Sequence, residues 1–419
     1  MWRATIIFIL VYLGLVLAKR YRPLIVWSGV VAALAVNALE PVELLLGIDW
    51  NVLGIFAGSL LLAELFLVSR LPETIADILI NKSPNLGIAF LSIIVFTSIL
   101  SSFIENVATV LIVAPVALQL ARKVEVSPVP VIIGLAISSN LQGTATLIGD
   151  PPSMILAAAR GMNFLDFFWY RGRMGIFFFV EIGALFGFAV LFLFLMNMRK
   201  RPVRIPVTEV RSWTPVWLIA SMILLLSLAS FIDRDFTWFA GTVCILIAAV
   251  GLLWYRGFDR EGFERLARHF DWGTTAFLAG IFVIVTMLEE RGAIDAFVDE
   301  LGSHRGAGPF LVYSAVVWIS VLISAFIDNV PYITAMLPVV TGIAGRLGMS
   351  AELLVFGLLI GSCLGGNITP IGASANIVAI GILDRTGNHV DFRSFVKIGL
   401  PFTLAATAAA YIALWLVWR

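Results

Sequence analysis

The sequence predicts an all-α polytopic membrane protein made of two inverted repeats, with about ten crossings, two re-entrant hairpins and discontinuous helices at the centre. Of its 419 residues, 60% are hydrophobic and 13% are charged, and the mean hydropathy is +1.00. Such a chain cannot hide its apolar side chains in a water-soluble core. Apolar runs of about 18 residues or more recur along its length, which favours membrane helices over the short alternating strands of an outer-membrane barrel.

Two stretches of the chain repeat at a constant separation of 223 positions. Residues 101–107, SSFIENV, return as residues 324–330, SAFIDNV. Residues 134–149 align with residues 357–372, and 9 of these 16 positions are identical. A repeat whose polar interruptions fall inside apolar tracts is typical of secondary transporters, in which two half-molecules meet around one central site.

Uninterrupted apolar runs long enough to span a membrane occur in both halves. They are 4–18, 23–39, 51–69 and 174–197, then 214–232, 236–255, 273–290 and 397–418. Further segments are apolar but broken by polar or helix-disfavouring residues, at 86–121, 128–160, 309–343 and 351–383. Segments of mixed polarity are interpreted as helices at the membrane surface or as solvated loops, at 70–84, 161–173, 256–270 and 291–306.

The tract 86–121 predicts a re-entrant hairpin. It holds about 36 residues, roughly 54 Å as a straight helix, whereas a hydrocarbon core is about 30 Å thick. Folding back resolves the mismatch and puts Glu105 and Asn106 at the tip, where non-helical backbone must face protein or a water-filled cavity. Asp328 and Asn329 occupy the corresponding tip in 309–343.

Glycine and proline interrupt the other broken segment of each half. Proline removes a backbone donor and clashes with the preceding helical turn, so we expect two half-helices joined by an unwound stretch. The interrupting residues are Gly143, Gly149, Pro151 and Pro152 in the first copy and Gly365, Gly366 and Pro370 in the second.

Lysine and arginine in short loops orient the chain. Basic residues put a first loop and a linker in the cytoplasm: Lys19, Arg20 and Arg22, then Arg199, Lys200, Arg201 and Arg204. Five crossings per half then give the halves opposite orientations, so the first hairpin opens to the cytoplasm and the second to the outside. We divide the chain into a first inverted repeat (1–197), a cytoplasmic linker (198–213) and a second inverted repeat (214–419), with scaffold and transport subdomains interleaved.

Three carboxylates lie within the broken apolar tracts: Glu105, Asp150 and Asp328. An intramembrane carboxylate is costly unless it is protonated, paired or hydrated. Asp150 has no acidic mate, because Ala373 stands at the corresponding position, and it is the candidate for the titrating or cation-binding group. Glu105 and Asp328 have an alternative role as helix caps that accept bonds from free backbone N–H groups, and the two roles can coexist.

Neutral polar residues surround the break points. Unwound carbonyls coordinate cations, while half-helix N-termini favour anionic or oxygen-rich groups. We predict substrate- or ion-binding residues at Glu105, Asn106, Asn140, Thr144, Thr146, Gly149, Asp150, Asp328, Asn329, Cys363, Asn367, Thr369, Ser374 and Asn376. A candidate sodium site lies near Asn106, Asp150, Asn329 and Asn367.

Each of these residue types also has a plainer interpretation. A single serine or threonine hydroxyl often bonds to its own helix backbone, and Cys363 has the alternative of a small buried side chain. Glu64 and Glu181 are further candidates inside plain spans. Arginines 160, 171 and 173 are interpreted as anchors at the membrane interface.

The repeated segments, together with residues 146–152 (TLIGDPP) and 372–376 (GASAN), resemble the ArsB/NhaD-type ion transporter superfamily. The resemblance is closest to the branch of the pink-eyed dilution permease and related anion permeases, with a citrate transporter-like domain, and covers essentially the whole chain. It implies a scaffold domain, a moving transport domain with two hairpins, elevator-type alternating access and a homodimer.

The hairpin tips depart from one related pattern. Divalent-anion sodium symporters of similar fold carry a Ser-Asn-Thr triplet at each tip, whereas this sequence has Glu105-Asn106-Val107 and Asp328-Asn329-Val330. Within the triplets, only Asn106 and Asn329 therefore match the pattern of those symporters. The extra negative charge suits cation coupling, proton exchange or a neutral solute such as arsenous acid.

Four functions remain open on the sequence. The first is a proton- or sodium-coupled secondary active transporter of an inorganic or organic anion or oxyanion, with arsenite-type efflux as one named option. The second is a sodium/proton antiporter, with the three acids as its coupled sites. A membrane-embedded enzyme lacks support, because HExxH, GxxxxGK[ST] and GxSxG do not occur where their mechanisms would operate. A channel is the fourth option.

The expected partners are a small ion or anion substrate and the lipid bilayer. Basic residues lie at segment ends and do not form a nucleic-acid patch. We expect no enzymatic activity and no cofactor beyond a coupling Na⁺ or H⁺. The expected location is the cell (plasma or inner) membrane, as a multi-pass protein, and an ATPase partner would not be visible in this sequence.

Overall fold

The computed structural model describes residues 1–18, 21–196, 198, 204–233, 235–302 and 308–419. Lys19, Arg20, Arg199, Lys200 and Arg201, whose charges orient the predicted topology, lie outside the described residues. The first half forms the helices α1 (Trp2–Leu17), α2 (Arg22–Ala35), α3 (Pro41–Leu46), α4 (Trp50–Ser69), α5 (Leu71–Lys82), α6 (Leu86–Ser101), α7 (Asn106–Lys123), α8 (Val129–Gly143), α9 (Pro151–Arg160) and α10 (Ile176–Leu195).

The second half follows the same plan. Its helices are α11 (Thr214–Ile232), α12 (Phe239–Phe258), α13 (Arg260–His269), α14 (Trp272–Glu290), α15 (Ala293–Gly302), α16 (Pro309–Ser324), α17 (Asn329–Leu347), α18 (Ala351–Gly365), α19 (Ser374–Arg385) and α20 (Phe392–Trp418). Helices α16, α17 and α19 each begin 223 positions after the start of α6, α7 and α9. Prolines stand inside α7 and α17 at the same separation, Pro115 and Pro338. The sequence repeat is therefore a structural repeat.

Among the described residues, eight helices are long and apolar enough to cross a membrane, by length and composition. The expected ten crossings include the shorter helices α1 and α2, of 16 and 14 residues, and the broken segments, which form the half-helix pairs α8–α9 and α18–α19 as predicted. The chain is thus a helical, multi-pass membrane protein with discontinuous helices at its centre.

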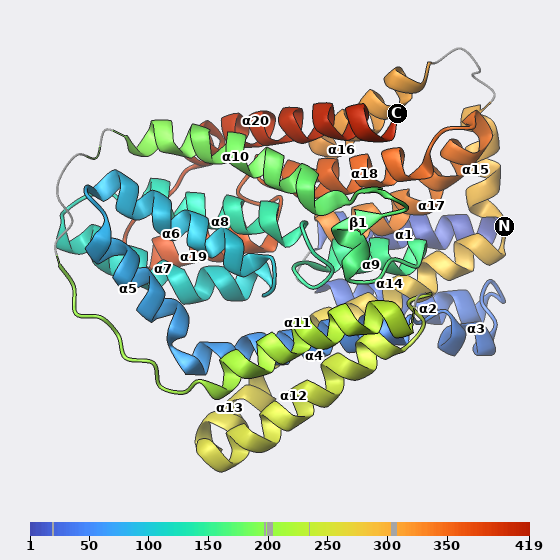
Figure 1. Ribbon diagram of the computed structural model, residues 1–419. Helices are drawn as coiled ribbons and strands as arrows, with labels where there is room; N and C mark the ends of the chain where they lie inside the picture. The colour runs from blue at the N-terminus through green and yellow to red at the C-terminus, as the bar shows by residue number, and fades with distance from the viewer. Residues whose placement is uncertain (19–20, 197, 199–203, 234, 303–307) are drawn as a thin grey trace.

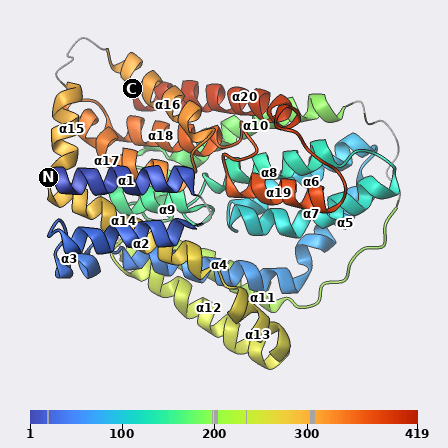
Figure 2. The same ribbon diagram turned by 180° about the vertical axis from the view of Figure 1, so that it is seen from behind.

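The helices pack in two groups (Figures 1 and 2). In the group that we call peripheral (α1, α2, α4, α11, α12 and α14), α4 runs along α11 and α12, and α2 packs on α14 and α1. In the hairpin group (α6–α10 and α16–α20), α6 packs on α8, α16 on α18, and α10 on α20. Small residues permit close approach: a Cβ on Gly58 of α4 would lie 2.5 Å from the backbone of Cys244 in α12.

The two re-entrant hairpins enter from opposite ends of the molecule, as predicted. Their tips are residues 102–105, between α6 and α7, and residues 325–328, between α16 and α17. In both views α6 and α7 lie with α8 at one end, and α16 and α17 lie with α18 at the other. The second half-helices cross over: α19 packs on α7 and α8, and α9 packs on α17 and α18. Each broken segment therefore completes the other repeat's bundle.

One surface segment differs from its predicted helix or loop. The segments around 70–84, 256–270 and 291–306 contain α5, α13 and α15, but 161–173 holds a short 3-10 helix, η2 (Leu165–Phe167), and the antiparallel strands β1 (Trp169–Tyr170) and β2 (Arg173–Met174). Between the strands, Arg171 and Gly172 have φ angles of 49° and 77°. Positive φ at both central residues is what a two-residue hairpin with a type I′ turn requires.

Candidate functional site

A cavity of about 450 Å³ lies where the hairpin tips face the peripheral group. It is lined by the predicted site residues Glu105, Asn106, Asp150, Asp328, Asn329 and Ser374. The other charged or hydroxyl-bearing lining residues are Arg22, Glu64, Asp271 and Thr274. The described lining therefore combines five carboxyl groups with one guanidinium group, which makes the cavity electronegative.

Five helices begin at this cavity, because the first residues of α2, α7, α9, α17 and α19 all line it. The positive end of a helix stabilises a nearby negative charge. Glu105 accepts the N–H of Ala108 at 2.9 Å, and Asp328 accepts the N–H of Val330 at 3.2 Å. The expected capping role of the two tip acids is confirmed.

Asp150 differs from the two tip acids. It occupies the N-cap position of α9 without a side-chain capping bond, it is 5% exposed, and its Oδ2 has no hydrogen-bond partner among the described residues. Ala373 takes the same position before α19. A buried carboxylate oxygen without a donor is costly unless a proton or a cation compensates it. Asp150 is therefore the carboxyl group of the cavity whose burial requires a proton or a cation as compensation.

Behind the cavity, Asn140 of α8 joins the two repeats. Its Nδ2 donates to Asn367 Oδ1 at 2.9 Å and to Asn376 Oδ1 at 3.0 Å, while its Oδ1 accepts from Asn106 Nδ2 at 3.0 Å. Asn376 in turn donates to the carbonyls of Gly366 and Thr369, each at 2.9 Å. Only Asn106 of these asparagines lines the cavity, so the network fixes the amide that a solute meets first.

Matched hydrogen bonds fasten each hairpin tip to the broken segment of its own repeat. Thr146 donates to the carbonyl of Ser102, and Thr369 donates to the carbonyl of Ala325. These four positions correspond across the repeat. The serines behave alike: Ser101 donates to Ser139 O at 3.0 Å, and Ser324 donates to Ser362 O at 2.5 Å. The unwound stretches thus hold the tips in place.

The unwound stretches are also compact. A Cβ on Gly149 would lie 2.5 Å from Gly143 O, and one on Gly372 would lie 2.4 Å from Gly366 O. Glycine at position 149 therefore allows the backbone there to lie against the backbone of Gly143. Thr144 donates to the carbonyl of Asn140 in its own helix at 3.3 Å, which is the plainer interpretation of a hydroxyl here.

The predicted site is therefore larger than the cavity wall, and eight of its members do not line the cavity in this conformation. All eight are buried and lie outside the described lining: Asn140, Thr144, Thr146, Gly149, Cys363, Asn367, Thr369 and Asn376. Cys363 is fully buried, with its sulfur 4.0 Å from Ser362 Oγ.

Sequence reasoning missed three of the charged or hydroxyl-bearing lining residues. Arg22 opens α2 and was used only to orient the chain, while Asp271 and Thr274 open α14, where Asp271 caps the helix through Thr274 N at 2.9 Å. An ionisable residue at the very start of an apolar span was the available signal. Glu64, a further candidate, lines the cavity; Glu181 does not, and it accepts from Gln142 of α8.

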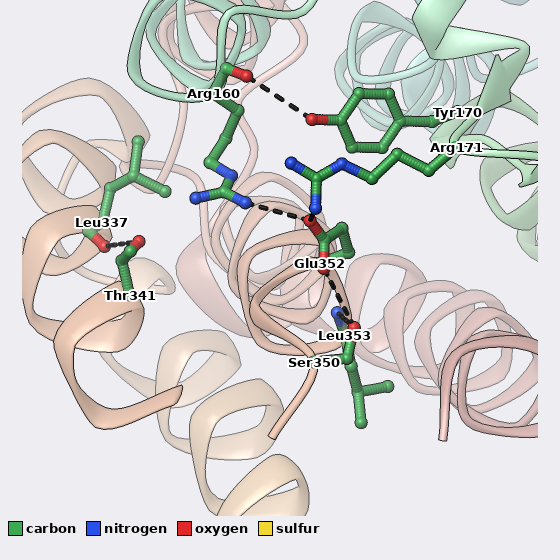
Figure 3. A network of polar contacts seen from close by, with 8 residues as sticks. All are labelled: Arg160, Tyr170, Arg171, Leu337, Thr341, Ser350, Glu352 and Leu353. Carbon is green, nitrogen blue, oxygen red and sulfur yellow. Dashed lines mark hydrogen bonds and ion pairs between the residues drawn. The ribbon is translucent and has the colours of Figure 1, made fainter. Parts of the chain in front are cut away.

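Two of the three arginines interpreted as interface anchors bind an acid of the second repeat (Figure 3). Arg160 Nη2 and Arg171 Nη1 each lie 2.9 Å from Glu352 Oε1. Glu352 is in the first turn of α18, so this network ties the end of α9 to the start of α18. Arg173 donates to the carbonyl of Val417 at 2.9 Å.

Paired hairpins and broken helices around a buried polar cavity, inside a multi-pass bundle, define a membrane transporter. Comparison with known proteins gives the same class. The chain belongs to the citrate transporter family, whose sequence model matches residues 12–361. This finding confirms the resemblance drawn from the repeated motifs.

Named relatives agree with this assignment. The chain is 28% identical over 381 residues to the uncharacterized transporter Rv2685 of Mycobacterium tuberculosis, covering 88% of this chain and 87% of the relative. It is 26% identical over 395 residues to the uncharacterized transporter slr0753 of Synechocystis, covering 88% and 86%. It is 25% identical over 496 residues to the P protein of Sus scrofa, covering 96% of this chain and 58% of that protein.

A solved structure has the same fold. The crystal structure of the YdaH transporter of Alcanivorax borkumensis, described as having an unusual topology, aligns with a TM-score of 0.62 and 13% identity. The alignment covers 89% of this chain and 86% of that chain. The citrate transporter family, Rv2685, slr0753 and YdaH are named as transporters, which are not enzymes.

Proposed function

We propose that this chain is a proton- or sodium-coupled secondary active transporter whose cargo is an inorganic or organic anion or oxyanion. The observation that carries the proposal is Asp150, whose Oδ2 lacks a described partner at the wall of the central cavity. A proton or a Na⁺ ion there would remove the cost of burying the charge. Filling and emptying of this one site would then be linked to the conformation that encloses it.

The second repeat supplies a different surface for the cargo. Ala373 leaves the N-terminus of α19 without an acidic cap, and Ser374 brings a hydroxyl to the cavity. A helix N-terminus favours negative or oxygen-rich groups. Arg22, the guanidinium group in the described lining, adds positive charge. The family's name points to carboxylates such as citrate, and arsenite-type efflux is the oxyanion option.

Two cavities along one interface support alternating access. The central cavity lies at the starts of α9, α14 and α17, while a second cavity, of about 520 Å³, lies further along the same helices and is lined by Ala158, Thr286 and Thr334. Both lie between the peripheral group and the hairpin group. We propose an elevator-type movement of the hairpin group, with the central cavity open to the cytoplasm in this conformation.

Sodium/proton antiport is the second candidate. It is favoured by the charge of the cavity, where five carboxyl groups face one guanidinium group in the described lining. In that case Asp150, Glu105 and Asp328 would exchange the two cations without a separate cargo. For both candidates we propose a location in the cell membrane. We also propose a homodimer, to which an ATPase could bind as a further partner.

A flux panel in proteoliposomes tests the function. Uptake of citrate, arsenite, chloride and Na⁺ is measured with and without imposed Na⁺ and proton gradients, for wild type and Asp150→Asn. We expect gradient-driven uptake of one anion by wild type and its loss, by more than about tenfold, in Asp150→Asn. Asp384→Asn, an exposed acid at the end of α19, is the matched control.

The outcomes separate the candidates. Na⁺ uptake driven by a proton gradient, without movement of any anion, would select the antiporter. Coupled uptake that persists unchanged in Asp150→Asn would remove Asp150 from the coupling role. Passive flux through wild type at channel rates, without coupling to either gradient, would reject the proposal.

A further inference from the structure

The tip of the second hairpin is joined to the peripheral group by an ion pair. Arg22 Nη2 lies 3.1 Å from Asp328 Oδ2, and the side chains are 22% and 12% exposed. Arg22 is the first residue of α2, whereas Asp328 caps α17. The pair therefore spans the two helix groups at the wall of the central cavity, where both residues are lining.

A second bond crosses at the same place. The hydroxyl of Tyr12, in α1, donates to the carbonyl of Pro331 at 2.7 Å. Pro331 lies in the first turn of α17, three residues after Asp328. The peripheral group thus holds the start of α17 through one side-chain ion pair and one hydrogen bond.

The first hairpin has a different environment. Glu105 accepts the N–H of Ala108, and the described ion pairs do not include it. The second helix of the other repeat, α12, begins with the apolar residue Phe239 where α2 begins with Arg22. The duplication therefore does not account for the Arg22–Asp328 pair. The two tips differ in charge, because among the described residues Asp328 has a cationic partner and Glu105 does not.

We propose that Arg22 is a tethered competitor of the coupling cation for the carboxylates of the central cavity, which include Asp150 and Asp328, and that it holds the empty carrier with the cavity open. This inference rests on the proposed cation coupling. Both Asp328 oxygens are in use in the empty state, Oδ1 with Val330 N and Oδ2 with Arg22. A cation that binds beside Asp328 must displace Arg22, and the displacement releases the ion pair between the helix groups. Arg22 is thus a positioning residue that makes movement of the hairpin group depend on cation loading.

The test reads the conformation directly. Leu111, which lines the cavity and is 47% exposed, is replaced by cysteine, and its modification by a membrane-impermeant thiol reagent is timed in vesicles with the cytoplasmic face outward. The native Cys244 and Cys363 are both fully buried. Rates are compared in choline medium and in Na⁺ medium at fixed pH, then at two pH values in choline medium.

The expected result in choline medium is that Arg22→Gln slows modification of Leu111→Cys by about three- to fivefold, because the ion pair that holds the cavity open is lost. Arg22→Lys retains a charge partner and stays near the wild-type rate. Tyr12→Phe shifts the rate in the same direction by less. Arg256→Gln, an exposed arginine at the end of α12, is the matched control without change.

Cation affinity gives the second readout. Arg22→Gln lowers the half-saturating cytoplasmic cation concentration by a similar factor, while Asp328→Asn abolishes the effect of Arg22→Gln in the double variant. Equal modification rates and equal cation affinity in wild type and Arg22→Gln would overturn the inference, and so would additive effects of the two substitutions. Wild-type protein without any cation-coupled flux would instead overturn the proposed function, whereas the choline-medium rates would still report on the ion pair.

Discussion

The two halves of the central site share a backbone and differ in charge. Thr146 and Thr369 make the same bond to their hairpin tips, although 223 positions separate them. Yet Asp150 faces the cavity in the first half, where the second half has Ala373. Asn140 likewise corresponds to Cys363. Duplication has preserved the bonds that shape the pocket, while the side chains that meet a solute have diverged, so the site can bind unlike partners on its two sides.

The largest expected effect is a difference in stability between variants of Asn140 and of Cys363, which occupy corresponding positions in the two repeats. Asn140→Ala leaves polar atoms of Asn106, Asn367 and Asn376 without partners, which we expect to destabilise the protein by about 2 kcal/mol or more. Cys363→Ala, at the corresponding position, removes a buried thiol and is expected to cost about 1 kcal/mol or less. Thermal unfolding in detergent measures both. Equal losses of stability in the two variants would contradict a special role of Asn140 in joining the two repeats.

The tip asparagines come next. Asn106 is fixed by Asn140 at 3.0 Å, whereas Asn329 is within 3.5 Å of Ser324 Oγ. Because both line the cavity, alanine at either position is expected to raise the KM for cargo by about tenfold, the loss of one hydrogen bond. The comparison is made by uptake kinetics in proteoliposomes, with expression and melting temperature as controls. Normal KM in either variant would contradict a site shared by both repeats.

The threonine pair tests the preserved part of the comparison. Thr146→Val and Thr369→Val each remove one hydroxyl bond between an unwound stretch and a hairpin tip. We expect nearly equal losses of stability, about 1 kcal/mol each. Chemical denaturation of the purified variants measures the difference between them. A difference well above the cost of a single bond would show that the two fastenings are not equivalent.

The smallest effect concerns an acid outside the membrane. Burial tends to raise the pKa of Asp233, but the N–H groups of Phe239, Trp238 and Thr237 outweigh it and lower the pKa to about 2, from a usual 3.8. Its contribution to the loop between α11 and α12 is complete above pH 3.8 and is lost as the pH falls through about 2. Asp233→Asn is therefore expected to leave the pH profile of transport unchanged between about pH 5 and pH 8. A shifted profile would mean that groups outside the central site set the pH dependence.

The sequence alone determined the doubled fold. Hydropathy marks the spans, and the excess length of 86–121 requires a hairpin, because both signals are local and run along the chain. The constant separation of 223 residues then joins the halves into one site and singles out Asp150 by its lack of a counterpart. These features became the hairpins, broken helices and cavity wall of the structure.

Only the tertiary structure decided which side chains meet in that site. Arg22 and Asp328 lie 306 positions apart in the chain, and Arg160 and Glu352 lie 192 apart. The hydropathy of the sequence does not predict such pairs, because they depend on how α2 and α9 pack against the second repeat. For the same reason the sequence could assign Asn140 and Thr146 to the site but could not show that they lie behind the cavity wall. Their positions are set by hydrogen bonds between distant segments.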